Sequence, residues 1–164
     1  MSTIQTIAEN YQSFNPRAYL QNNYIPPRAD FDNPGSVVPW KLRCLADACA
    51  SGEIGGQLMV DIGTGPTVYQ LLSAFELFKE VVLTDYLEVN RDEIRKWLRG
   101  ETGTFDWGPY IKHVCNIEGK GLKDPRRGSG ERGTCRRETQ VGRYAGEIRT
   151  GMVGIGLVPL TAPN

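Results

Sequence analysis

The sequence predicts an α/β fold organised around one parallel βαβ unit. Two apolar runs, at 57–63 and 80–85, have the composition of strands, and an apolar pattern at helical spacing lies between them at 67–78. A strand, a helix and a second strand in this order form a right-handed crossover between parallel strands. The first run is almost continuously apolar, so we expect a strand covered on both faces.

Helical segments are predicted before, between and after these strands, at 39–52, 67–78, 87–100 and within 105–119. Asp106 is the expected cap of the last one. Residues 4–14 show a weaker helical pattern. The apolar stripes expected to face the core are Leu42, Leu45, Ala46 and Cys49, then Val68, Leu71, Leu72 and Phe75, then Ile94, Trp97 and Leu98.

Composition divides the chain near Gly119. Residues 1–119 carry 10 Lys and Arg against 15 Asp and Glu, whereas residues 120–164 carry 9 against 4. Residues 121–151 are rich in glycine and show neither strand nor helix periodicity, so we expect this basic tail to be disordered. A nucleic-acid-binding tail is the functional alternative, but repeated RGG units and interleaved aromatic residues are lacking.

Charge and hydropathy exclude several classes of partner. The formal net charge is zero, which gives no reason to expect nucleic acid or an anionic membrane, and no apolar run is long enough to cross a bilayer. The N-terminus lacks the basic start and apolar stretch of a signal peptide. The four cysteines show no C-x-x-C spacing and His113 is the single histidine, so we expect no metal site and reduced thiols in a cytoplasmic protein.

A glycine-bracketed turn, Asp61-Ile62-Gly63-Thr64-Gly65, follows the first predicted strand, at the edge where α/β sheets bind ligands. Glycine permits a tight turn and lets a ligand approach where a Cβ would collide. Asp85 closes the second predicted strand, where a carboxylate can accept hydrogen bonds from both hydroxyls of a ribose. This pattern predicts a nucleoside-binding half-site, and a plain tight turn capped by Asp85 is the structural alternative.

The residues around the turn also favour one nucleoside over another. Val68 replaces the third glycine of a dinucleotide fingerprint, which argues against NAD. An Asp before the turn favours S-adenosylmethionine, which carries ammonium and sulfonium cations and no phosphate. Carboxylates and aromatic rings suit such cations, and Asp61, Tyr69 and Tyr86 supply them.

Six segments of the chain are specific enough to compare with a known family. They are YQSFNPRAYLQNNYIPPRADF, PWKLRCLA, GEIGG, DIGTGPTVYQLLSAFE, LTDYLEVNRDEIRKWLR and FDWGPYIKHVCNIEGKG. Together they resemble the phenylethanolamine, nicotinamide and indolethylamine N-methyltransferases. The resemblance is almost continuous from about Tyr11 to Gly121, and the segments NNYIPPR and PWKL favour the phenylethanolamine branch.

The resemblance implies the N-terminal part of a Rossmann-like class I methyltransferase fold with an incomplete sheet. Residues 1–57 would be a cofactor-covering segment and helix, 58–121 the first βαβα part of the core, and 122–164 an unrelated tail. The implied cofactor is S-adenosylmethionine, the implied partner is a small amine, and no catalytic acid or base is implied. The implied cofactor contacts are Tyr11, Tyr19, Tyr24, Gly63, Gly65, Thr67, Tyr69, Gln70, Asp85, Tyr86 and Asn90, and the implied acceptor contacts are Asn23, Arg28 and Lys41.

Because the resemblance stops after Gly121, we expect a truncated chain, and two interpretations stay open. One is a truncated amine N-methyltransferase, with nicotinamide or an indolethylamine as alternative acceptors. The other is a non-catalytic product that binds the cofactor weakly or associates with a partner. The acceptor amine and the oligomeric state are not determined by the sequence.

Overall fold

The computed structural model describes residues 11, 13–119 and 148–151. The weakly predicted helix at 4–14 falls almost entirely outside these residues. The regular elements, in chain order, are α2 (Pro16–Asn23), α3 (Val37–Ala50), β1 (Gly56–Ile62), the short 3-10 helices η1 (Tyr69–Leu71) and η2 (Phe75–Leu77), β2 (Phe78–Thr84), α4 (Glu88–Leu98), α5 (Gly108–Ile117) and β3 (Ile148–Gly151).

The three strands form one parallel sheet in the order β1-β2-β3, which confirms the predicted α/β class and the parallel crossover. β1 runs alongside β2 until Ile62 stands opposite Thr84, so both strands end at the same edge of the sheet. β3 comes from the tail that was expected to be disordered, and this expectation is wrong for residues 148–151. Residues 148–151 form a strand by pairing with the free edge of β2, although their sequence has no apolar pattern that predicts one. Most of the tail lies outside the described residues.

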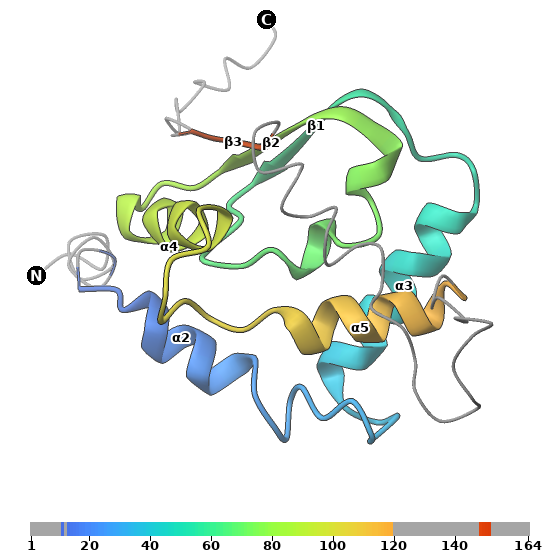
Figure 1. Ribbon diagram of the computed structural model, residues 1–164, viewed down its shortest axis with the longest axis horizontal. Coiled ribbons are helices and arrows are strands. Elements are labelled where there is room, and N and C mark those ends of the chain that lie inside the picture. Colours follow the sequence, from blue (N-terminus) through green and yellow to red (C-terminus); the bar gives the residue numbers. More distant parts are fainter. Residues whose placement is uncertain (1–10, 12, 120–147, 152–164) are drawn as a thin grey trace, which may run out of the picture.

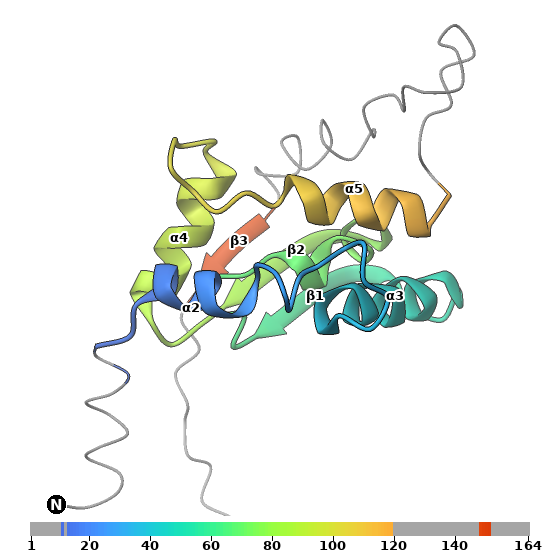
Figure 2. The same cartoon turned by 90° about the horizontal axis from the view of Figure 1, so that it is seen from below.

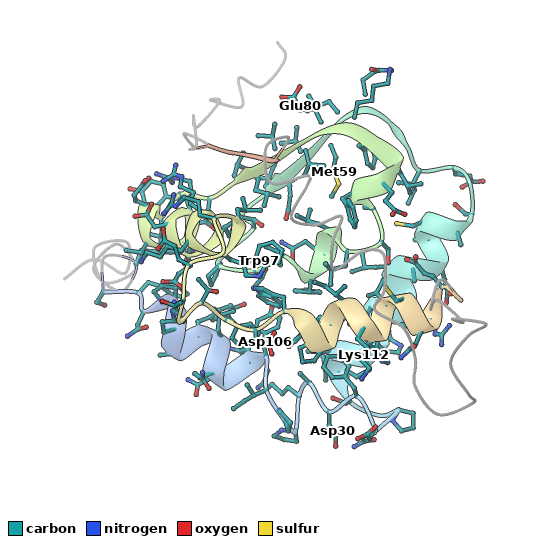
Figure 3. The ribbon with its side chains drawn as sticks, in the orientation of Figure 1. Asp30, Met59, Glu80, Trp97, Asp106 and Lys112 are labelled. Carbon is teal, nitrogen blue, oxygen red and sulfur yellow. The ribbon has the colours of Figure 1, made fainter. Side chains whose placement is uncertain are left out.

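The sheet is covered by helices on one face. α2, α3 and α5 lie below it in Figure 1, and Figure 3 places Met59 on this side and Glu80 on the opposite one. In β1, Leu58, Val60 and Ile62 are 52, 49 and 73% exposed, whereas Met59 packs against the core. The prediction that β1 is covered on both faces is therefore wrong. Its apolar composition does not reveal whether a second layer is present.

The hydrophobic core fills the space between the sheet and the helices. Leu83 of β2, Ile94 of α4 and Val114 of α5 are at most 1% exposed. The Tyr110 hydroxyl on α5 donates a hydrogen bond of 2.7 Å to the backbone oxygen of Tyr24. This buried bond fixes the end of α2 against α5, which matters below because Tyr24 lines the functional site.

The segment 67–78 does not form the predicted α-helix and contains only the 3-10 helices η1 and η2. Side chains in this region offer the backbone an alternative to a helix: Thr67 Oγ1 donates to the Thr64 oxygen at 2.8 Å, and Gln70 Nε2 donates at 3.1 Å to the Thr67 oxygen, which a helix would use. No α-helix N-terminus therefore follows the glycine turn. The predicted apolar stripe is nevertheless buried, and it consists of Val68, Leu71, Leu72 and Phe75.

The other three predicted helices are confirmed as α3, α4 and α5. In α3, Leu42 and Ala46 are buried and Leu45 is half-buried, as its stripe predicts. Asp106 accepts a hydrogen bond of 2.8 Å from the Gly108 amide at the start of α5, although the capping position itself belongs to the next residue.

The cysteines differ from one another in their chemical state. Cys44 and Cys49 form no disulfide, but Cys115 is disulfide-bonded, so the expectation of reduced thiols is wrong for Cys115. Pairing depends on spatial proximity, which sequence spacing does not show. Within the described residues, no group of His, Cys, Asp and Glu could hold a metal ion, and no helix is both long and apolar enough to cross a membrane.

Leu83 and Leu58 offer a matched test of this one-sided burial. Leu83→Ala should lower the free energy of unfolding by about 3 kcal/mol, because it leaves a cavity in the core. Leu58→Ala should change it by less than about 0.5 kcal/mol, because this side chain is already in water. Urea denaturation of both variants measures the difference, and equal losses would contradict the uncovered face.

The environment of His113 lets us predict how the free energy of unfolding changes with pH. Burial, and then the nearby Arg43 charge, lower the pKa of His113 below its usual 6.5. The folded chain therefore favours the neutral imidazole more strongly than the unfolded chain does. This contribution to stability is present above pH 6.5 and is lost as the pH falls from there through the lowered pKa.

Urea denaturation between about pH 7.5 and about pH 5 checks this prediction. The wild-type chain should lose more stability over this interval than His113→Gln does. Parallel curves for the two proteins would show that the imidazole does not titrate as proposed.

Candidate functional site

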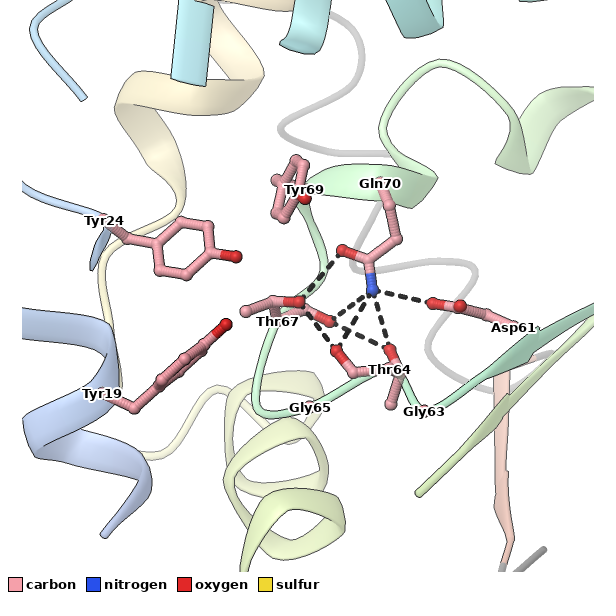
Figure 4. Close-up of a pocket in the computed structure, with 9 residues that line it drawn as sticks. All are labelled: Tyr19, Tyr24, Asp61, Gly63, Thr64, Gly65, Thr67, Tyr69 and Gln70. Carbon is pink, nitrogen blue, oxygen red and sulfur yellow. Dashed lines mark hydrogen bonds between the residues drawn. The ribbon is translucent and has the colours of Figure 1, made fainter. Parts of the chain in front are cut away.

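A pocket of about 280 Å³ lies between α2 and the turn that follows β1 (Figure 4). α2 contributes one wall, and the end of β1 with η1 contributes the other. The side chains and glycines that line it are Tyr19, Tyr24, Asp61, Gly63, Thr64, Gly65, Thr67, Tyr69 and Gln70.

The first wall is aromatic. Asn15 starts α2 by accepting a hydrogen bond of 3.0 Å from the Ala18 amide, and Tyr19 and Tyr24 follow at the pocket. The ring of Tyr24 lies 5.9 Å from that of Tyr19 and 5.4 Å from that of Tyr69, centroid to centroid. Burial, with smaller contributions from Tyr69 and Tyr19, raises the pKa of Tyr24 far above its usual value. Tyr24 is therefore a neutral phenol that can donate a hydrogen bond but does not act as a base.

The second wall is the glycine turn. Gly63 and Gly65 have φ angles of +74° and +63°, which side chains rarely adopt, and nothing lies within 4 Å of a Cβ built on either. The Gly63 amide donates to the Thr84 oxygen and the Gly65 amide to Asp85 Oδ2, both at 2.8 Å. The turn is thus fixed to the end of β2 while its other side stays open to a ligand.

The Gln70 side chain organises the floor of the pocket. Its Nε2 donates to Asp61 Oδ2 at 2.7 Å and to Thr64 Oγ1 at 2.8 Å, while Thr67 Oγ1 donates to its Oε1 at 3.1 Å. These bonds hold the Asp61 carboxylate at the pocket, as its place before the turn indicated. Thr64 was not among the predicted contacts. Its position between the two glycines is the signal that could have identified it.

Asp85 and Asn90 form a buried polar pair beside the turn. Asp85 Oδ1 accepts hydrogen bonds from the Leu87 amide at 2.8 Å and from Asn90 Nδ2 at 3.0 Å. With the Gly65 amide on Oδ2, three of roughly four acceptor positions of the carboxylate are occupied. Asn90 Oδ1 is buried and has no hydrogen-bond partner among the described residues. A ligand hydroxyl or amino group that reached it would satisfy this acceptor.

Seven predicted contact residues are not part of the pocket lining, and two of them are Asp85 and Asn90, buried beside the turn. Tyr11 and Tyr86 are 53 and 62% exposed. The predicted acceptor residues Asn23 and Arg28 lie together, with Arg28 Nη1 donating to Asn23 Oδ1 at 3.2 Å, and Lys41 is exposed on α3. The structure therefore brings together the predicted cofactor contacts around the glycine turn and leaves the predicted acceptor contacts outside the pocket lining.

Comparison with known proteins identifies the group to which this sequence and pocket belong. The model of the NNMT/PNMT/TEMT family matches residues 3–142, which is most of the chain. The chain belongs to this family. The matched range covers the aromatic wall, the glycine turn and the Asp85–Asn90 pair, and it continues beyond Gly121, where the family segments read from the sequence end.

Curated relatives come from all three branches of the family. Phenylethanolamine N-methyltransferase of Bos taurus is 58% identical over 118 residues, 72% of this chain and 42% of the relative. Human nicotinamide N-methyltransferase is 41% identical over 123 residues, which are 74% of this chain and 46% of the relative. Mouse indolethylamine N-methyltransferase is 40% identical over 115 residues, which are 68% of this chain and 42% of the relative. The higher identity supports the predicted likeness to the phenylethanolamine branch, and the chain spans less than half the length of these relatives.

Asp85 should stabilise the chain before any ligand binds. Asp85→Ala removes the acceptor of two backbone amides and one side-chain amide, so the free energy of unfolding should fall by about 2–3 kcal/mol. The matched control is Asp92→Ala on α4, whose exposed ion pair with Arg95 contributes less than about 1 kcal/mol. Urea denaturation without ligand measures both, and an Asp85 loss no larger than the Asp92 loss would contradict the bonding described.

Proposed function

We propose that the pocket binds S-adenosylmethionine and that the chain takes part in methyl transfer to a small amine of the phenylethanolamine type. The observation that supports this most is the pairing of three tyrosine rings with one carboxylate across an open glycine turn. The ligand carries two cationic centres on its amino-acid end and an uncharged nucleoside on the other. The pocket offers groups of matching chemistry on its two sides.

The amino-acid end suits the space between Tyr19 and Tyr24 on the aromatic wall and the Asp61 carboxylate on the opposite wall. Aromatic faces attract sulfonium and ammonium groups through the ring quadrupole, and a carboxylate adds a direct charge partner. Gln70 keeps the carboxylate of Asp61 in place with a bond of 2.7 Å. This part of the pocket therefore needs little rearrangement to receive a cation.

The nucleoside end suits the Asp85–Asn90 pair. Asp85 retains roughly one open acceptor position, and the orphaned Asn90 Oδ1 offers another. A ribose hydroxyl or an adenine amino group could donate to either. Gripping both ribose hydroxyls with Asp85 alone would require the Gly65 amide to release Oδ2. Tyr86 lies exposed beside this pair and is available to stack on a base.

The chemistry requires positioning more than proton transfer. A bound cofactor would supply an electrophilic methyl group on a sulfonium, which a neutral amine would accept as the bond from sulfur to the methyl carbon breaks and a neutral thioether leaves. The chain's contribution is to orient the cofactor between its two walls and to keep water away from its aromatic side. Tyr24, held protonated by burial, orients through hydrogen bonding and takes no proton from the amine.

A binding-only role is the second candidate, and the pocket geometry favours it. Asn23, Arg28 and Lys41, the residues expected at the acceptor amine, are absent from the pocket lining. The volume of about 280 Å³ lies near the lower end of the range for small-molecule sites, roughly 300–1,000 Å³. A pocket of this volume suits part of the cofactor, and the described residues that line it include none of the expected acceptor contacts.

Calorimetric titration with S-adenosylmethionine tests the proposal directly. The wild-type chain should bind, and Asp61→Asn should weaken binding about tenfold, which is the loss of one charge-assisted contact of ~1.4 kcal/mol. The matched control is Asp47→Asn, an exposed carboxylate on α3 outside the pocket, which should leave the affinity unchanged. A wild-type chain that releases no heat of binding would refute the proposed site.

A methyl-transfer assay with phenylethanolamine separates the two candidate functions. Transfer by the wild-type chain, reduced in Asp61→Asn, would support the enzyme. Binding without transfer of label to phenylethanolamine, nicotinamide or an indolethylamine would support the binding-only role.

A further inference from the structure

An ion pair joins α2 to α4 behind the pocket. Arg17 Nε lies 2.7 Å from Glu93 Oε2, and Arg17 Nη1 also donates to the backbone oxygen of Gly103. Glu93 is only 9% exposed on its side chain, whereas Arg17 is 42% exposed. Figures 1 and 2 both show α2 beside α4. Arg17 therefore binds a carboxylate that is largely withdrawn from water, a setting in which an ion pair is worth more than at an open surface.

The two ends of this ion pair lie on helices that are linked to different walls of the pocket. Arg17 precedes Tyr19 on α2 by about half a helical turn, so its position helps to set where the tyrosine rings stand. Glu93 follows Asn90 on α4, and Asn90 binds Asp85, which in turn holds the Gly65 amide. α4 thus connects the two walls: its Glu93 pairs with Arg17 of α2, and its Asn90 binds Asp85, which holds the Gly65 amide.

We propose that Arg17 and Glu93 are positioning residues that set the distance between the aromatic wall and the glycine turn, and thereby the affinity for a ligand that spans both. The inference rests on the proposed function for the identity of that ligand. Neither residue lines the pocket, so their effect on binding passes through α2 and α4. A ligand that contacts only the glycine-turn side should not depend on the pair.

The test compares S-adenosylmethionine with adenosine. Arg17→Gln should weaken S-adenosylmethionine binding about tenfold, within the range by which residues remote from a ligand alter its affinity. Binding of adenosine should change less than about twofold, because adenosine needs only the Asp85 side of the site. General loss of structure would weaken both ligands together. This ratio therefore distinguishes positioning from destabilisation.

The chain offers a matched control and a rescue. Arg99→Gln removes the same side chain from an ion pair of the same length, 2.7 Å, which is exposed, joins Arg99 to Glu101 after α4 and does not contact α2; it should leave both affinities unchanged. Arg17→Lys keeps a cation near Glu93 and should recover most of the lost affinity. Lys96 Nζ, 3.6 Å from Glu93 Oε1, still balances the carboxylate in Arg17→Gln, which lets this variant fold.

The outcomes separate this inference from the proposed function. Equal weakening of both ligands, or no weakening of either, would overturn the positioning role while cofactor binding stands. If the wild-type chain binds neither ligand, the proposed function fails, and hydrogen exchange at the Tyr24 amide, which donates to the Leu20 oxygen, decides the inference. Faster exchange in Arg17→Gln than in Arg99→Gln supports a fixed α2, and equal exchange overturns it.

Discussion

The hydrogen bond between the Gly65 amide and the Asp85 carboxylate joins the ends of two parallel strands into one site. It exists because the register of β1 and β2 brings both strands to the same edge, where the chain must turn in each case. Parallel pairing places the turn after β1 next to the end of β2. Gly65 adopts the backbone conformation that directs its amide to Asp85. Asn90 joins this bond by donating to Asp85, and the Gln70 contacts fix Asp61 and Thr64 on the other side of Gly65.

The opposite wall has a different origin, because α2 is not part of the sheet. Its tyrosines reach the pocket through packing against α5, through the hydroxyl bond of Tyr110 to Tyr24, and through the ion pair of Arg17. A site assembled in this way combines a rigid edge with a wall whose position depends on a few contacts. Membership of the N-methyltransferase family extends over both parts, since the matched range includes α2 and the two paired strands β1 and β2.

The sequence predicted the order of the strands, most helices and the meeting of the glycine turn with Asp85, because these follow from local periodicity and from parallel topology. It did not predict that 67–78 would lack an α-helix, since hydroxyl and amide side chains there compete for the carbonyls. The apolar character of Leu58 and Val60 could not show that these side chains are exposed and that the described helices do not cover them. The location of Lys41 away from the pocket likewise depends on how α3 packs, which no local pattern encodes.

The exposed row formed by Leu58, Val60 and Ile62 affects how the chain associates with other chains in solution. These side chains stand on β1, whose outer backbone edge pairs with no other strand within the described part of the chain. An edge strand with unpaired backbone amides and adjacent exposed apolar side chains can pair with another extended polypeptide. We therefore expect this edge to favour association between copies of the chain, and more strongly as the protein concentration rises.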